Sequence, residues 1–271
     1  MSESRRNDVL ALAILTSLVT VLFVDILVGR NALYLRDIVH YAYPHKKIVR
    51  DVVLSGEFPY WNRLFSGGQP LAANPAHTAF YPLTWLVLLP SYDYGFQLFI
   101  LVHIYIAAWA MYALLRSLDL GPPASLIGAL SFALGGVFLS YLTLLPLLVA
   151  SAWIPLVCLF ARRFLLHGRG GDFALAAVAL SMQLLIGEPT TVLQTGMMIG
   201  LYALFTRRMR GVVLVGLIVI AALLLSAVAI IPAVDHARDS IRARGFSWEA
   251  SATAHADVYR SLLNREAAVP V

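Results

Sequence analysis

The sequence contains few charged residues, and this scarcity excludes a water-soluble fold. Asp, Glu, Lys and Arg together make up 13% of the 271 residues, about half the share of a typical soluble domain. Hydrophobic residues make up 60%, and the mean hydropathy is +0.78. A water-soluble globule of this size would leave too much apolar surface uncovered. The composition therefore predicts a membrane protein.

Cysteine and closely spaced histidines are also scarce. The only cysteine, Cys158, lies inside an apolar run, so no disulfide can form within the chain. No His-x-x-x-His pair is present to hold zinc on one helical face. Asp37, His40, His45 and His77 offer ligands, but their spacing matches no known zinc site. We therefore expect no zinc site.

Long apolar runs account for most of the remaining sequence. Seven of them reach or approach the ~20 residues that a helix needs to cross a bilayer. They cover residues 9–28, 95–115, 125–142, 146–160, 173–186, 192–205 and 212–231. Backbone groups find no partners in lipid, so such runs must be helical. We expect an all-α polytopic protein of about seven transmembrane helices, whose first span is retained because no cleavage site closes it.

The distribution of arginine orients these spans. Arginines stand at 5–6, 116, 162–163, 169, 207–208 and 210, on short loops of one side, whereas the loops around 144–145 and 187–189 have no Lys or Arg. The positive-inside rule then places the N-terminus in the cytoplasm. The net charge of +5 reflects this topology and indicates no nucleic-acid partner. We expect a membrane domain over 1–232, with a long outer loop at 29–94, and an extracytoplasmic tail over 233–271.

The outer loop is expected to carry short helices. Residues 45–55 predict an amphipathic helix whose positions 48, 49, 52 and 53 are apolar. Lys46, Lys47, Arg50 and Asp51 lie away from that face. The helix suits the membrane interface, and it equally suits packing against neighbouring spans. Residues 78–89 are too short to cross and rich in aromatics, which favours an interfacial or re-entrant segment.

Two carboxylates are candidates for chemistry. Asp37 lies just past the outer end of the first span, and a lone loop acid is usually only solvated. Here a cationic and aromatic cluster follows within ten residues, comprising His40, Tyr41, His45, Lys46 and Lys47. Asp37 can accept a proton, or it can bind Mg²⁺ or Mn²⁺ together with a substrate phosphate. Glu188 either marks a loop before a helix that starts at Pro189, or serves as a second functional acid.

Other polar and aromatic positions have two interpretations each. Asp25, inside the first span, is interpreted as a polar contact between helices rather than a catalytic acid. Trp61 stands in the turn at 56–62, where it suits an interfacial aromatic belt. Aromatic faces also stack on sugar rings, and the sequence does not separate these two roles.

The order of the loop residues resembles that of the YfhO-like bacterial membrane proteins, which belong with the C-type glycosyltransferases. The residues that carry the resemblance are Asp37, Tyr43-Pro44, Gly-Glu-Phe-Pro-Tyr-Trp-Asn at 56–62, Gly-Gly-Gln-Pro-Leu at 67–71, Asn74-Pro75, Tyr-Pro-Leu at 81–83, Ile-Ile-Pro at 230–232, and Ser240, Arg242 and Gly245. One departure is Glu188, because the family pattern has a histidine after the preceding glycine.

The resemblance implies a GT-C-like fold and a glycosyltransferase of the bacterial inner membrane. Such an enzyme moves a sugar from a polyprenyl-phosphate carrier to an acceptor hydroxyl of the cell envelope, on the extracytoplasmic face and with inversion. Asp37 is then the general base. Glu188, where the chain departs from the family pattern, is the second candidate catalytic carboxylate because of its own position at an outer loop. The expected substrate-binding residues are His40, Tyr41, Lys46, Lys47, Arg50, Trp61 and Arg63.

Two further expectations accompany this hypothesis. Members of the family are longer, so we expect this chain to be a fragment or truncated product. The competing class is a transporter or flippase of lipid-linked or envelope polymers, which would use the same cations to hold a phosphate but would need no base. The mostly Leu, Val and Ala composition of the spans favours the enzyme.

Overall fold

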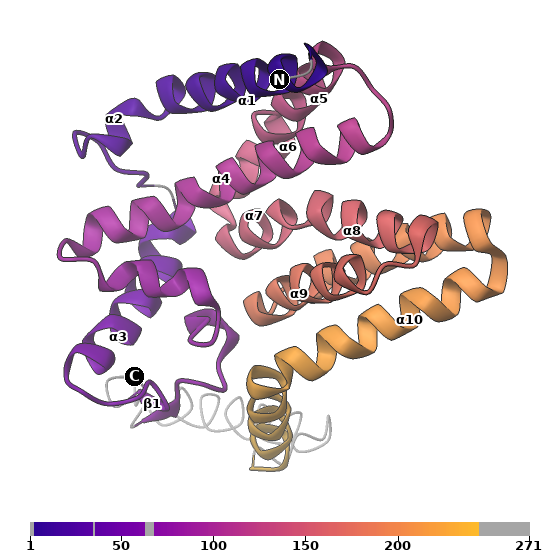
Figure 1. The fold of residues 1–271 in the computed structure, drawn as a ribbon. Helices are drawn as coiled ribbons and strands as arrows, with labels where there is room; N and C mark the ends of the chain where they lie inside the picture. The colour runs from indigo at the N-terminus through magenta and orange to yellow at the C-terminus, as the bar shows by residue number, and fades with distance from the viewer. Residues whose placement is uncertain (1–2, 35, 63–67, 244–271) are drawn as a thin grey trace, which may run out of the picture.

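The computed structural model describes residues 3–34, 36–62 and 68–243, and nearly all of this part of the chain is helical (Figure 1). Its α-helices are α1 (Glu3–Leu22), α2 (Val24–Leu27), α3 (Tyr43–Leu54), α4 (Tyr92–Ser117), α5 (Pro122–Ala133), α6 (Gly136–Ser140), α7 (Leu145–Ala152), α8 (Ile154–His167), α9 (Gly170–Ile186) and α10 (Pro189–Ala243). The shorter helical turns are η1 (Ile38–Ala42), η2 (Pro75–His77), η3 (Pro82–Leu88) and η4 (Tyr141–Thr143). Two short antiparallel strands, β1 (Trp61–Asn62) and β2 (Gln69–Pro70), pair in the outer loop.

Four helical segments are long and apolar enough to cross a membrane. They are Tyr92–Ser117, Pro122–Thr143, Leu145–His167 and Pro189–Arg238. An all-helical protein with helices able to span a membrane is therefore confirmed. Seven spans stay a prediction: α9 has only 17 residues, and α1 begins in the polar N-terminal segment at Glu3 and already ends at Leu22.

Proline and glycine set the ends of several helices. Pro122 and Pro189 stand in the first turns of α5 and α10, where a missing N–H costs nothing. α8 and α9 end at Gly168 and Gly187, whose φ angles of 68° and 74° are left-handed. Glycine adopts this conformation without the steric penalty of a Cβ, which makes it a common helix terminator.

The helix α10 reverses direction at Arg208. The backbone there has φ 54° and ψ −144°, which no helix contains. Figure 1 shows the chain turning back at this point, so the segments before and after Arg208 run side by side. The reversal falls in the arginine-rich loop predicted at 207–210, between the apolar runs 192–205 and 212–231.

The helices stack side by side, and helices that are neighbours in the stack contact one another (Figure 1). α4 packs against α1 and α5 on one side and against α7 and α8 on the other. α8 in turn contacts α9, and α10 packs on both. Asp25, in α2, is exposed, and no hydrogen bond or ion pair of its side chain to other described residues is found. The polar contact between helices interpreted for Asp25 is therefore not found among the described residues and stays a prediction.

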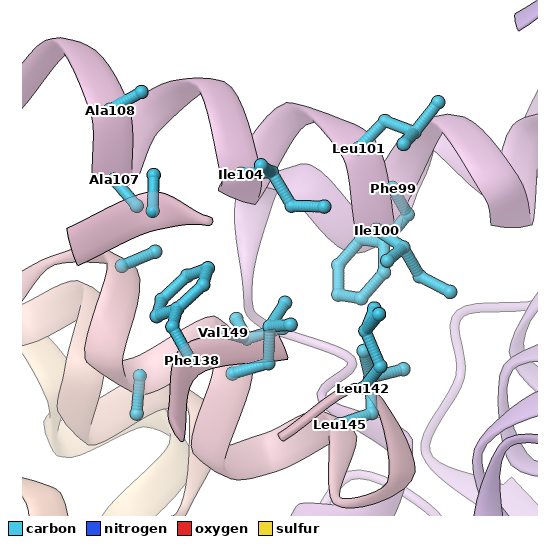
Figure 2. Packing of buried hydrophobic residues seen from close by; sticks show 14 of the residues in the cluster. Phe99, Ile100, Leu101, Ile104, Ala107, Ala108, Phe138, Leu142, Leu145 and Val149 are labelled. Carbon is cyan, nitrogen blue, oxygen red and sulfur yellow. The ribbon is translucent and has the colours of Figure 1, made fainter. Parts of the chain in front are cut away.

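Apolar side chains of α4 form the centre of the core. Figure 2 shows Phe99, Ile100 and Ile104 facing Leu145 and Val149 of α7. Ala107 and Ala108 are completely buried farther along α4. Small residues of this kind let helix backbones approach closely, which replaces the hydrophobic effect as a source of helix association in lipid.

A buried polar network fastens the outer loop to the helix stack. Tyr81 is completely buried just before η3, and its hydroxyl lies 2.5 Å from Nε2 of His103 in α4. Nδ1 of His103 lies 2.6 Å from the carbonyl oxygen of Phe99, so Nδ1 carries the proton and Nε2 accepts from Tyr81. The Trp153 indole N–H donates to the same Tyr81 oxygen at 2.9 Å. The loop is thereby tied to α4 and to the junction of α7 and α8.

Candidate functional site

The turn η2 is the point where the outer loop meets the end of the helix stack. Contacts join it to η1 and α3 within the loop and to α9. The Asn74 side chain caps this turn by accepting the Ala76 N–H at 3.0 Å. Pro75 lies so close to Gly187 that a Cβ on that glycine would stand 2.3 Å from Cβ of Pro75. The residues around η2 are therefore held against the junction of α9 and α10.

Thr78 ends η2 in a strained conformation. Its φ of 49° and ψ of 41° are left-handed, a true outlier for a β-branched residue. Its buried hydroxyl lies 2.7 Å from the Thr84 hydroxyl and accepts a hydrogen bond from Lys46 at 2.6 Å. Such strain persists only where the surrounding contacts enforce it, and these two hydrogen bonds are among them.

Lys46 is a buried cation and not a residue of a solvated polar face. It is 3% exposed, and its Nζ lies 4.9 Å from the ring centre of Phe99. No carboxylate among the described residues pairs with it. Burial alone lowers the pKa of Lys46 to about 7. An uncompensated buried ammonium is costly, so this site favours either the neutral amine or a bound anion.

Two histidines continue the cluster beside Lys46. His77 is 1% exposed, and neither of its ring nitrogens has a partner among the described residues. Its ring centre lies 4.9 Å from that of His45, and His45 lies 4.5 Å from the half-exposed ring of Tyr41. Burial, together with the neighbouring His45, lowers the pKa of His77 to about 4. Sequence reasoning treated His77 only as a weak zinc candidate, and its burial beside Lys46 came from tertiary structure.

Lys47 and Arg50 lie in environments that differ from that of Lys46. Lys47 forms an ion pair with Asp51 one helical turn away. The Arg50 guanidinium donates to the carbonyl oxygens of Val87, of Leu89 at 2.5 Å and of Pro90 at 3.1 Å. Arg50 thus fastens α3 to the end of η3. Lys46, Lys47 and Arg50, each expected as a substrate-binding cation, are separated because each faces a different neighbour of α3.

The apolar face of α3 is covered by protein. Val49 forms a buried cluster with Leu71 and Ala79, and Ile48, Val52 and Val53 pack against it. Of the two placements open at the level of sequence, the packed one agrees with these contacts.

The remaining loop candidates are exposed. Asp37 and His40 are exposed, and no hydrogen bond or ion pair of the Asp37 carboxylate to described residues is found. Trp61 is 51% exposed in β1, with its indole close over Gly68. Arg63 lies outside the described residues, as does the tail from residue 244 onward.

Glu188 lines an apolar cleft of about 410 Å³ between the loop and the α9–α10 junction. Its carboxylate accepts the Thr191 backbone N–H at 2.6 Å and so caps the start of α10. Burial pushes the pKa of Glu188 upward, but hydrogen bonds from Thr191 and Thr190 outweigh it and hold this pKa below its usual range. Glu188 is therefore an ionised helix cap that also faces a cavity, and α10 starts at Pro189 as the simpler interpretation predicted. Asp37 does not line this cleft.

A second, smaller cavity adjoins the cleft. It measures about 20 Å³, and its walls include Tyr41 and Lys46. Pro75 and Thr78 line both cavities. A single turn, η2, therefore separates a buried cation from an apolar cleft that contains a carboxylate. Among the described residues, no group of three or more His, Cys, Asp or Glu side chains is placed to hold a metal ion.

Comparison with protein-family models, with curated proteins and with solved structures gave no match for this chain.

Proposed function

We propose that this protein is a membrane glycosyltransferase that moves a sugar from a polyprenyl-phosphate carrier to an acceptor hydroxyl on the extracytoplasmic face. The observation that carries the proposal is the pair of cavities that share Pro75 and Thr78. A lipid-linked phosphate needs an apolar surface for its chain, a cation for its phosphate and a carboxylate beside the reacting sugar. The cleft, Lys46 and Glu188 would supply these three elements around η2, and Asp37 stands directly before η1, which contacts η2.

The chemistry demands few protein groups. The acceptor oxygen attacks the anomeric carbon, the bond from that carbon to the phosphate oxygen breaks, and the carrier phosphate leaves with the electron pair. The acceptor proton passes to a carboxylate, and the single displacement inverts the anomeric centre. A general base contributes ~10²–10⁴-fold, and a cation stabilises charge developing on the phosphate. No acid is needed, unlike in glycoside hydrolysis, because phosphate is already a good leaving group.

Asp37 is the proposed base, because its exposed carboxylate is not engaged with other described residues. Glu188 is the second candidate, since it faces the cleft but also caps α10. Lys46 is the proposed phosphate cation, with His40, Tyr41, Lys47, Arg50, Trp61 and Arg63 as the other expected substrate contacts. Mg²⁺ or Mn²⁺, if required, would be held by Asp37 and the substrate phosphate.

The proposal includes the topology expected from the arginine distribution. The protein would cross the bacterial inner membrane about seven times, with its N-terminus in the cytoplasm and the membrane domain ending near residue 232. Cysteines introduced at Ala76 and Gly170, in a Cys158→Ser background, should react differently with an impermeant maleimide in intact cells. Ala76→Cys should be labelled and Gly170→Cys spared, and the reverse pattern would refute the orientation.

Substitution of the two carboxylates tests the enzyme. Asp37→Asn should retain folding and carrier binding but lower sugar transfer by at least ~10²-fold. Glu188→Gln keeps an oxygen to accept from Thr191, so it separates a catalytic role from the helix cap. Asp119→Asn, an exposed acid after α4, is the matched control. Release of polyprenyl phosphate from polyprenyl-phosphate glucose, mannose or galactose, with cell-envelope extract as acceptor, gives the rate.

The same variants distinguish the competing transporter. A transporter would move fluorescent polyprenyl phosphate across proteoliposomes at equal rates with and without Asp37→Asn. Full transfer activity in both Asp37→Asn and Glu188→Gln would refute the catalytic role of these carboxylates.

A further inference from the structure

A third cavity lies at the other end of the helix stack, away from η2. It measures about 310 Å³ and is formed by side chains of α4, α5, α8 and α10; α4 packs on α5 and α8, and α8 packs on α10. Its size is at the lower end of small-molecule sites. Apolar residues such as Met111, Phe132 and Met198 make most of its wall. We call it the Arg162 pocket, after the one charged residue among the described residues that line it.

The Arg162 pocket is elongated along the helix axes. On α8 it is lined by Ile154, Cys158 and Arg162, which stand four residues apart on one face. Eight residues of helix span about 12 Å. Helices that cross a membrane lie roughly along its normal, so the pocket extends through part of one leaflet with Arg162 at one end. This shape matches an extended hydrocarbon chain below a headgroup.

Arg162 differs from three other arginines at this end of the stack. Arg163 pairs with Asp172 at 3.2 Å, Arg116 pairs with Asp8 at 2.6 Å, and Arg207 donates to the Leu165 carbonyl at 2.9 Å. The buried Nε of Arg162, in contrast, has no hydrogen-bond partner among the described residues. The Tyr202 hydroxyl also belongs to a pocket-lining residue, and no hydrogen bond of it to described residues is found.

A guanidinium without a counter-charge beside an apolar slot is an incomplete site. Buried polar groups normally have partners. Asp8 is engaged by Arg116, and Asp172 pairs with Arg163 through Oδ1, while its buried Oδ2 makes no hydrogen bond to Arg162 or to any other described residue. Arginine recognises phosphate with parallel hydrogen bonds. Basic pockets between membrane helices bind anionic lipid headgroups in this way.

We propose that the Arg162 pocket binds one anionic phospholipid of the surrounding bilayer, with an acyl chain along α8 and its phosphate on Arg162 and Tyr202. The site is separate from the cavities around η2, so this inference does not depend on the proposed glycosyl transfer. The bound lipid would fill the space between α4, α8 and α10 and supply the counter-charge that the described residues do not.

Lipid binding to the purified, delipidated full-length protein tests the proposal. Native mass spectrometry would compare phosphatidylglycerol with phosphatidylcholine of identical acyl chains. The wild type should bind one phosphatidylglycerol at least tenfold more tightly. Arg162→Gln should abolish that preference, whereas Arg162→Lys should retain most of it. Arg210→Gln removes the same charge from an exposed turn and should change nothing.

A pocket-filling variant and a headgroup mimic test the acyl chain. Met198→Trp should weaken binding of both lipids, with circular dichroism showing that the helices remain. Inorganic phosphate at the same concentration should not displace phosphatidylglycerol, because it has no acyl chain to bury in the apolar part of the Arg162 pocket. The proposal is overturned by an unchanged preference in Arg162→Gln, by an equal loss in Arg210→Gln, by undiminished binding in Met198→Trp, or by displacement with phosphate.

Discussion

The burial of Lys46 makes the stability of this protein depend on pH in a predictable way. Burial lowers the pKa of Lys46 from 10.5 to about 7. Between pH 7 and pH 10.5 the unfolded chain therefore carries a proton on Lys46 that the folded protein lacks. Stability consequently rises with pH through this window. Below pH 7 both states are protonated and the full penalty applies.

The size of the effect follows from the difference between the two pKa values. A difference of about 3.5 units corresponds to a maximum of about 5 kcal/mol, of which about 3 kcal/mol remains at pH 8 and less than ~1 kcal/mol at pH 10. Lys46→Met removes the titrating group and keeps a chain of similar length beside Phe99. The variant should therefore gain about 2–3 kcal/mol more, relative to the wild type, at pH 8 than at pH 10.

Equilibrium unfolding in mixed micelles with increasing dodecyl sulfate measures the stability of variant and wild type at both pH values. The difference between the variant's gain at pH 8 and its gain at pH 10 is the double difference. Comparing two pH values cancels the constant terms, including the lost hydrogen bond to Thr78, whose hydroxyl keeps its contact with Thr84. Lys47→Met removes the same charge from the partly exposed neighbouring position and is the matched control. A double difference near zero for Lys46→Met, or one equal to that of Lys47→Met, would refute the buried-cation reasoning.

Two further substitutions test how the outer loop is held against the helix stack, each by thermal unfolding in detergent. Gly187→Ala should destabilise by at least ~1 kcal/mol, because alanine resists the left-handed conformation and its Cβ would meet Pro75 at 2.3 Å. Gly196→Ala, with open space around its Cβ position, should be neutral or stabilising, and equal losses at both glycines would contradict the close contact. Tyr81→Phe should lower the free energy of unfolding by about 1–3 kcal/mol for each buried partner left unpaired, one of which is His103. An unchanged unfolding midpoint would contradict the network.

Local features of the sequence anticipated the helices well. Long apolar runs and the scarcity of charge were sufficient to predict an all-helical membrane protein, because lipid leaves the backbone no other way to pair its polar groups. Pro189 and Gly187 marked helix ends through their own conformational limits. The amphipathic pattern over 45–55 likewise coincides with α3, since its apolar positions repeat with the helical period.

The candidate site depended on contacts that no local pattern contains. The sequence grouped Lys46, Lys47 and Arg50 by their closeness along the chain. A helix directs such neighbours to different faces, so packing left Lys46 buried, Lys47 paired with Asp51 and Arg50 bonded to the end of η3. The order of residues alone could not predict which side of α3 would face α4.

The sequence by itself determined the class of protein, the approximate positions of its helices and the concentration of polar groups in the outer loop, because these follow from hydrophobicity and local conformation. Only the tertiary structure placed η2 against the α9–α10 junction, buried Lys46 and His77 together, and opened a cleft beside Glu188. The contact of η2 with the α9–α10 junction joins segments more than a hundred residues apart, and Lys46 lies 32 residues before its partner Thr78. Such contacts are decided by the packing of whole surfaces and not by any single stretch of sequence.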